Sequence, residues 1–197
     1  MILTLIKSRK LLLLPCCLLI LNGCASNTKQ LIISPQITTK FANIYSQVHA
    51  NINSLDMRAS THIVQILRDD KAAKLTSSTS SIAMEVEKSL RDIFNQQGLV
   101  ITNTKTESKI DITILIDTAL ISVKQDLMKY QANNSISLRF QIKNADKTLT
   151  KSFNSHGKSN GPLNADLAVL ERDFNQQLTK LIQQIADDNE IQAFITQ

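Results

Sequence analysis

Apolar and polar residues alternate over several stretches of this chain with the period of two that a half-buried β-strand requires. In residues 110–116 every second position is isoleucine, and most positions between them are polar. In residues 121–123 the apolar positions are odd-numbered instead of even-numbered. Because a strand cannot move its apolar face without an inserted residue, we predict a bulge or break near residues 118–120.

Other stretches of the chain predict four further strands. Residues 136–142 alternate again, and residues 144–147 have the composition of a hairpin turn, so residues 148–159 are expected to return as the next strand. Two earlier runs, residues 48–53 and 61–67, alternate or are rich in β-branched side chains, which is typical of strands.

Three segments have the apolar period of a helix. Residues 82–97 form one apolar stripe, and Gly98 follows where a left-handed C-terminal cap would lie. A second helix is predicted from a cap at Asn164 to Ile185. Asp187 would be unfavourable at the negative end of that helix, so residues 187–195 are predicted as a short separate helix.

These elements predict a single α+β domain over residues 31–197. Strands with one apolar face are typical of an antiparallel sheet that is covered on one side. We therefore expect two layers, with two main helices packed on one face of a mostly antiparallel sheet of about five strands, and a short C-terminal helix.

The N-terminal segment predicts export from the cytoplasm. Three basic residues precede an apolar run, residues 11–21, which has about half the 20 residues that a membrane-spanning helix needs. The run ends at Leu21-Asn22-Gly23-Cys24, which resembles the lipobox of bacterial lipoproteins. We predict that residues 1–23 are a signal peptide, that Cys24 is acylated, and that residues 24–30 form a short linker.

This interpretation also accounts for the three cysteines. Two of them lie in the predicted signal peptide, and Cys24 becomes a thioether, so disulfides and thiolate chemistry are not expected in the mature domain. Several acyl chains on one residue anchor a protein stably. Ala25 is not the aspartate that retains lipoproteins at the inner membrane, so we predict the periplasmic face of the outer membrane.

Composition adds few constraints. Without the signal peptide the formal net charge falls from +5 to +2, because that segment carries three bases and no acid. The chain has no tryptophan, six phenylalanines and two tyrosines, so it offers no platform on which bases stack. Nucleic acid is therefore not an expected partner.

Several short pieces together resemble the YajG-like family of bacterial lipoproteins. They are the lipobox at Cys24, Ile33-Ser34-Pro35, Asp56-Met57-Arg58, the helix that runs into Gly98, Tyr130, and the tail over residues 187–195. The resemblance implies a periplasm-facing lipoprotein with no assigned catalysis and no known cofactor.

The residues themselves also predict no enzyme. His49, His62 and His156 form no zinc-binding pattern, and no nucleophile elbow is present. Asp111 and Asp117 share a strand face, but six residues of strand separate them by about 20 Å, too far for paired carboxylate catalysis. We predict no catalytic, metal-binding or cofactor-binding residue.

The basic hairpin and one arginine are the candidate binding residues. The hairpin carries Arg139, Lys143, Lys147, Lys151 and Lys158 against the single acid Asp146. These bases either protect a solvated sheet edge or form a docking face for anionic lipid head groups, lipopolysaccharide or an acidic protein. Arg58 either pairs locally with Asp56 or contacts an anionic ligand.

The sequence thus favours a non-enzymatic, membrane-anchored lipoprotein that acts as an interaction or assembly-support module in the bacterial envelope. The alternative is a lipoprotein that binds or handles lipid or lipopolysaccharide, which would need an apolar cavity between helices and sheet.

Overall fold

A computed structural model describes residues 29–38, 42–103 and 108–197. The predicted signal peptide and Cys24 lie outside the described residues. The strands are β1 (His49–Asp56), β2 (Val64–Arg68), β3 (Lys71–Thr76), β4 (Val100–Thr102), β5 (Ile110–Gln125), β6 (Lys129–Asn144) and β7 (Lys147–Pro162). The helices are α1 (Ile82–Gln96), α2 (Leu167–Ala186) and α3 (Asn189–Ile195).

Three long strands form the centre of the sheet. β5, β6 and β7 have 16 residues each and pair antiparallel in chain order. The other edge of β5 has two neighbours: β1 pairs with its first half and β2 with its second half, both in parallel. β4 extends the sheet beside β1, and β3 extends it beside β2. The sheet is therefore mixed and branches at β5.

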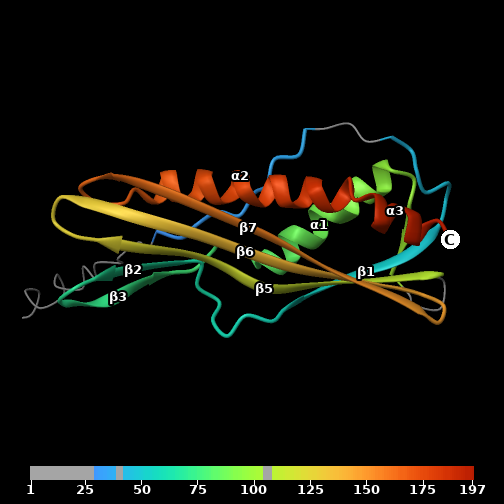
Figure 1. Cartoon of the computed structure of the whole chain (residues 1–197), viewed down its shortest axis with the longest axis horizontal. Helices are drawn as coiled ribbons and strands as arrows, with labels where there is room; N and C mark the ends of the chain where they lie inside the picture. Colours follow the sequence, from blue (N-terminus) through green and yellow to red (C-terminus); the bar gives the residue numbers. More distant parts are fainter. Residues whose placement is uncertain (1–28, 39–41, 104–107) are drawn as a thin grey trace, which may run out of the picture.

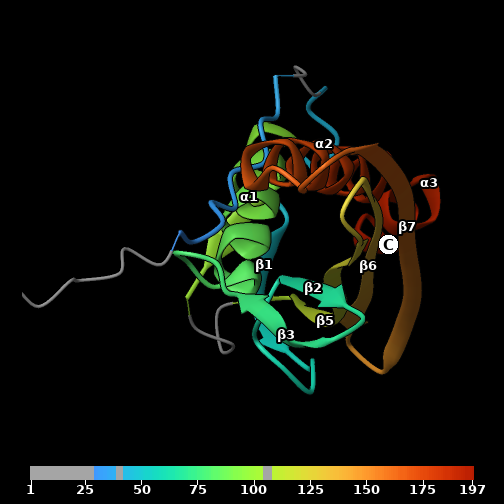
Figure 2. The ribbon, with the colours of Figure 1, turned by 90° about the vertical axis from the view of Figure 1, so that its left-hand side faces the viewer.

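The predicted two-layer, mostly antiparallel sheet of about five strands is wrong. The described chain has a seven-stranded sheet with three parallel pairings, and the sheet curls into a half-barrel that holds the helices on its concave side (Figures 1 and 2). Alternation shows which face of a strand is buried, but it does not show which strand lies beside it or in which direction. Long twisted strands also curl as they cover two helices.

The predicted irregularity in β5 is confirmed, next to the range expected from the sequence. The register between β5 and β6 shifts between Ile116 and Thr118, and the buried positions change there from even-numbered to odd-numbered residues. The same place divides the opposite edge of β5, because β1 pairs as far as Ile116 and β2 begins at Ile121. The bulge thus keeps one continuous apolar face under two different neighbours.

The helices begin and end close to their predicted positions. Gly98 follows α1 with φ of +91°, the left-handed conformation that a glycine cap adopts. The cap of α2 is Asp166 instead of Asn164, because the Asp166 carboxylate accepts a hydrogen bond from the Ala168 amide at 3.0 Å. α3 is capped by Asp188, whose carboxylate accepts from the Glu190 and Ile191 amides.

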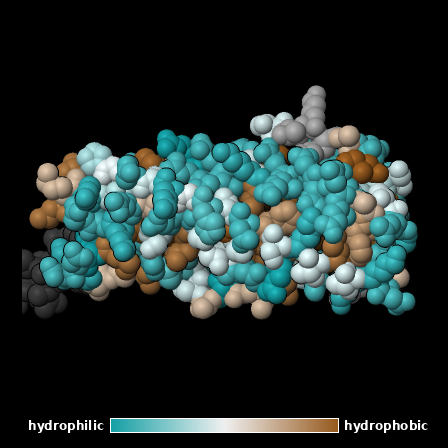
Figure 3. Space-filling view, viewed as in Figure 1, coloured by the Kyte–Doolittle hydropathy of each residue, from teal (hydrophilic) through white to brown (hydrophobic). Residues whose placement is uncertain are grey.

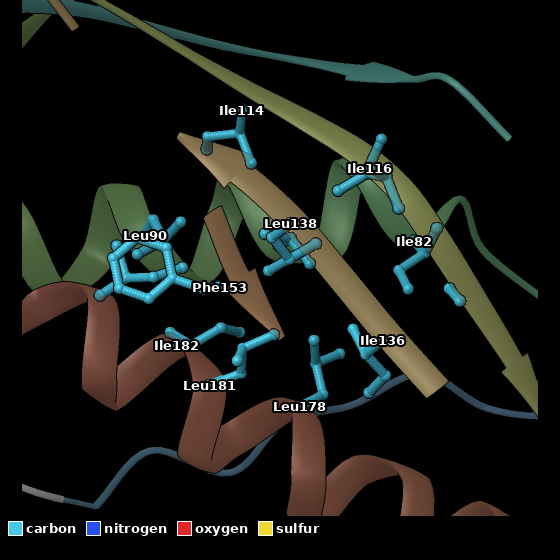
Figure 4. Close-up of a cluster of buried hydrophobic side chains, with 14 of the residues drawn as sticks. Ile82, Leu90, Ile114, Ile116, Ile136, Leu138, Phe153, Leu178, Leu181 and Ile182 are labelled. Carbon is cyan, nitrogen blue, oxygen red and sulfur yellow. The ribbon is translucent and has the colours of Figure 1, made fainter. Parts of the chain in front are cut away.

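The core lies between the concave face of the sheet and the two long helices. Figure 4 shows aliphatic side chains of α1, α2 and the long strands meeting there. Ile114, Ile136 and Leu178 are fully buried, and the Phe94 and Phe140 rings lie 6.1 Å apart between α1 and β6. The space that a lipid-handling protein would keep open is filled with apolar side chains. None of the described helices is long and apolar enough to cross a membrane.

An extended segment, residues 31–37, runs alongside α2, and we call it the N-terminal strap. Its backbone amides donate to side chains one helical turn apart: Ile32 to Glu171 (2.7 Å), Ser34 to Asn175 (2.9 Å) and Gln36 to Thr179 (3.1 Å). Two residues of extended chain advance about 6.6 Å and four helical residues about 6 Å, so the two repeats match. The alternate side chains of Leu31 and Ile33 are buried in the core.

Candidate functional site

Four basic residues of the β6–β7 hairpin lie on two different faces of the sheet. Arg139 and Lys143 project from the convex face, whereas Lys147 and Lys151 share the concave side with their cross-strand partners Asn144 and Phe140. Because the hairpin pairs odd-numbered residues of β7 with even-numbered residues of β6, residues of the same parity on the two strands lie on opposite faces. The four therefore do not form one patch.

The two residues on the concave side bind the C-terminal part of the chain. Lys151 contacts the Asp188 carboxylate at 2.7 Å and the Glu190 carboxylate at 2.8 Å, and these hydrogen bonds raise the pKa of Lys151. Burial raises the pKa of Asp188, but hydrogen bonds from Lys151 and from backbone amides outweigh it and lower the pKa overall. Lys147 lies 3.5 Å from the Gln197 side chain. Lys151 thereby fastens the start of α3 to β7.

Arg58 is largely buried. Its side chain is 7% exposed, pairs with Asp56 at 2.7 Å and donates to the carbonyl oxygen of Ala119 at 3.2 Å. The hydrogen bond from the Arg58 side chain is the main cause that lowers the pKa of Asp56. The geometry is that of the local ion pair, and it leaves little of the guanidinium open to a ligand.

The face of β5, β6 and β7 that points away from the helices carries the other basic residues of these strands. We call it the convex face. Its polar positions are mainly Ser, Thr, Asn and Gln, some of which pair across strands, such as Ser137 with Asn154 at 2.7 Å. The basic residues of this face are Lys124, Lys129, Arg139, Lys143 and Lys158, and its acidic residues are Asp111 and Asp117. The face is therefore positively charged.

Most of these cations form no ion pair with another described residue. Arg139 forms a two-pronged contact with Asp117, at 2.8 and 3.2 Å, and this contact raises the pKa of Arg139. Lys143 and Lys158 form no salt bridge within the described ranges, which leave out 1–28, 39–41 and 104–107. Lys143 lies opposite Asp111 in the strand register, whereas Lys158 lies opposite Asn133, so a partner with carboxylates or phosphates would meet at Lys158 a charge with no acid across the strand pair.

Two cations of the convex face, Lys124 and Lys129, were not singled out from the sequence. The signal was present for Lys124: once the phase of β5 changes at the bulge, even-numbered residues point to the convex face, and Lys124 is one of them. Lys129 is the first residue of β6 and is odd-numbered like Arg139 and Lys143, so it lies on the same face of the strand.

β7 also provides an open strand edge beside this face. Within the described chain β7 pairs with β6 alone, so alternate backbone N–H and C=O groups along its 16 residues face away from the sheet. Such an edge accepts an added strand from a partner.

The histidines lie apart from one another. His49 and His156 are exposed, and the His62 ring contacts the Ser60 hydroxyl at 2.5 Å. Ser155 and His156 point to opposite faces of β7. Among the residues that the structure describes, no group of three or more His, Cys, Asp or Glu side chains is placed to hold a metal ion.

The fold is shared with a solved structure. The protein XCC0632 from Xanthomonas campestris has a TM-score of 0.61 at 12% identity, over 84% of this chain and 97% of that one, which shows a shared fold. The rare lipoprotein B from Shewanella oneidensis is also similar, with a TM-score of 0.35 at 10% identity over 62% of this chain and 92% of that one. No curated protein sequence matches the chain.

The chain belongs to the family described as uncharacterized lipoproteins (Lipoprotein_16), whose model matches residues 35–196. The predicted resemblance to a bacterial lipoprotein family is confirmed at this level. The narrower YajG-like assignment stays a prediction. Membership of a lipoprotein family agrees with a membrane-anchored protein.

Proposed function

We propose that this lipoprotein is a non-enzymatic interaction module of the bacterial envelope that binds an acidic protein partner on its convex face. In this proposal acylated Cys24 holds the domain at the periplasmic face of the outer membrane. The observation that carries the proposal is the excess of cations on the convex face, five against two carboxylates, with Lys143 and Lys158 outside any salt bridge of the described chain.

The open edge of β7 supports the same proposal. Lys158 and the cations of β6 lie next to this edge, so charges would orient a partner before its backbone pairs with β7. Lysines near an edge also discourage unselective pairing, so the same residues that favour an acidic strand would exclude a neutral one.

The test is a charge reversal with a matched control. The double variant Lys143→Glu/Lys158→Glu changes two exposed positions of the convex face, whereas Lys88→Glu/Lys180→Glu makes the same change at exposed positions of α1 and α2. After crosslinking in intact cells, we expect the first pair to lose most of a specific crosslinked partner and the second to retain it. Equal recovery from both variants would contradict the proposal.

Lipid or lipopolysaccharide handling is the alternative function. It would need room between the helices and the sheet, where apolar side chains are packed instead. Native mass spectrometry of the purified protein separates the two functions: stoichiometric co-purified lipid beyond the Cys24 modification would favour lipid handling. Membrane fractionation and the mass of the N-terminal peptide test the outer-membrane address and the acylation.

A further inference from the structure

Three exposed apolar side chains gather at one end of the molecule. Leu127 and Met128 form the turn between β5 and β6 and are 92% and 75% exposed, and Leu163, just after β7, is 62% exposed. We call these three residues the apolar tip. Figure 3 shows hydrophobic residues at the left-hand end of the molecule, where Figure 1 places the β5–β6 turn.

The turn that carries the tip is held by its own hydrogen bonds. The Asp126 carboxylate accepts from the amides of Met128 and Lys129, both at 2.8 Å, and these bonds lower the pKa of Asp126. The Leu163 amide donates to the Met128 carbonyl oxygen at 2.8 Å, so the turn and the end of β7 are joined. Leu163 has φ of +61°, a conformation that leucine rarely adopts.

Side chains behind the tip fasten it to the sheet. Gln125 is 7% exposed, and its amide contacts the Asn164 side chain and accepts from the Ala165 amide at 3.2 Å. The Tyr130 ring lies over Gly161, its partner on β7. Three apolar side chains are thus presented to the outside by a fixed backbone.

Charged side chains lie beside the tip, on the side that faces the β2–β3 turn. Open grooves of about 480 and 810 Å³ run between the β2–β3 turn and the β5–β6 turn, and they are lined by Arg68, Lys71, Lys124 and Lys129. None of these four cations forms a salt bridge to another described residue. Asp69, Asp70 and Asp126 lie among them, so the cations exceed the carboxylates by one. Apolar contact, more than charge, would govern binding here.

The membrane tether emerges within reach of this end. Leu31 hydrogen-bonds to Ser77, beside the Thr76–Val64 pair, and Val64 pairs with Ile121 of β5. From Ile121 to Leu127 is six residues of strand and turn, about 20 Å. From Cys24 to Leu31 is seven residues, which span at most about 24 Å when extended. The dark blue start of the described chain lies in the same half of the molecule as the β5–β6 turn (Figure 1).

We infer that the apolar tip inserts into the surface of the lipid bilayer that holds the acyl anchor. Leu127, Met128 and Leu163 enter the boundary between headgroups and acyl chains, while the lysine and arginine stems lie along it with their charges at the phosphates. The long axis of the domain then stands away from the membrane, and the part of the convex face that carries Arg139, Lys143 and Lys158 stays open to a partner. The inference depends on the acylated Cys24 of the proposed function.

Because the chain has no tryptophan, a single introduced tryptophan reports its surroundings without background. The tip variant is Leu127→Trp. The control is Leu55→Trp, since Leu55 is also an exposed leucine, 49% exposed, but lies on β1 opposite the first half of β5. Full-length acylated protein is reconstituted into vesicles of phosphatidylethanolamine and phosphatidylglycerol, with and without brominated phosphatidylcholine as a quencher.

We expect the fluorescence of Leu127→Trp to shift to shorter wavelength and to be quenched by the brominated lipid, and that of Leu55→Trp to change in neither way. Quenching should persist in high salt, because the charges around the tip nearly balance. An unquenched Leu127→Trp, or equal quenching at both positions, would overturn the inference. Flotation of the vesicles separates the two proposals. Protein that floats with an unquenched Leu127→Trp contradicts insertion of the tip but agrees with the acyl anchor. Protein that does not float contradicts the acyl anchor itself.

Discussion

The guanidinium of Arg58 donates a hydrogen bond to the backbone carbonyl oxygen of Ala119 at 3.2 Å. Ala119 lies where β5 has lost β1 as a neighbour and has not yet gained β2. The Arg58 side chain therefore supplies the hydrogen bond that a neighbouring strand would otherwise donate to this carbonyl oxygen. The Asp56 carboxylate orients Arg58 by accepting two hydrogen bonds, at 2.7 and 2.8 Å. This contact satisfies a backbone oxygen in the gap between the two short strands that share one edge of β5.

Arg58→Ala should therefore destabilise the fold. The substitution leaves a carbonyl oxygen and the Asp56 carboxylate without their partner, which we expect to cost about 2–3 kcal/mol in free energy of unfolding. Urea denaturation followed by circular dichroism measures it. Arg172→Ala is the matched control, because Arg172 is 62% exposed and pairs with Asp173, so a loss of at most about 0.5 kcal/mol is expected. A similar loss in both variants would show that Arg58 supports no special contact.

Asp56 should make stability depend on pH. The hydrogen bond from Arg58 lowers the pKa of Asp56 in the folded protein, whereas in the unfolded chain the carboxyl titrates near pH 4. The stabilisation is therefore complete above that pH and is lost as the pH falls through the folded pKa. Between about pH 5 and pH 3 the wild type should lose more stability than Asp56→Asn, in which this position no longer titrates. Parallel stability curves for the two proteins would contradict the prediction.

Two glycines of β7 should tolerate alanine differently. A Cβ at Gly161 would lie 2.7 Å from the Tyr130 ring, which is 8% exposed, so we expect Gly161→Ala to cost about 1–3 kcal/mol. At Gly157 the obstacle is the end of the flexible Gln177 side chain, which can turn away, so Gly157→Ala should change stability by at most about 0.5 kcal/mol. Thermal unfolding measures both, and the cost at Gly161 should shrink in a Tyr130→Leu background.

The N-terminal strap should loosen when one side chain of α2 is removed. Asn175 accepts a hydrogen bond from the Ser34 amide and donates one to the Ile32 carbonyl oxygen at 2.8 Å. Asn175→Ala should lower the local opening free energy of the strap by about 1 kcal/mol, seen as faster hydrogen exchange at the Ser34 amide. Gln176→Ala, at an exposed position of the same helix, should leave that exchange rate unchanged. Equal rates in both variants would mean that the strap is held by its buried side chains alone.

Short sequence patterns predicted the bulge in β5 and the apolar stripe of α1, because both depend on residues that are close together in the chain. The change of phase in β5 required an inserted residue, and the bulge lies beside the predicted range. The stripe of α1 and its glycine cap followed from periodicity and from backbone sterics at Gly98. The caps of α2 and α3 were misplaced by one or two residues, because neighbouring Asp and Asn residues compete for the same amides.

For the candidate binding residues, spacing along the sequence did not predict which face of the sheet each one lies on. The sequence groups the hairpin bases together, but the pairing of odd with even residues across the hairpin puts Lys147 and Lys151 on the opposite face from Arg139 and Lys143. The apolar tip could not be inferred, since Leu127, Met128 and Leu163 meet only when β7 returns beside the β5–β6 turn.

By itself the sequence determined the three helices, five of the seven described strands and the buried side of each, because these follow from spacing along one chain, whereas the short strands β3 and β4 were not predicted. It also carried the resemblance to a lipoprotein family that the match over residues 35–196 confirms. Only the tertiary structure decided that β1 and β2 run parallel to β5, that the sheet curls around its helices, and that the cations divide between two faces. Strand neighbours depend on contacts between residues far apart in the chain, and spacing along the sequence holds no record of them.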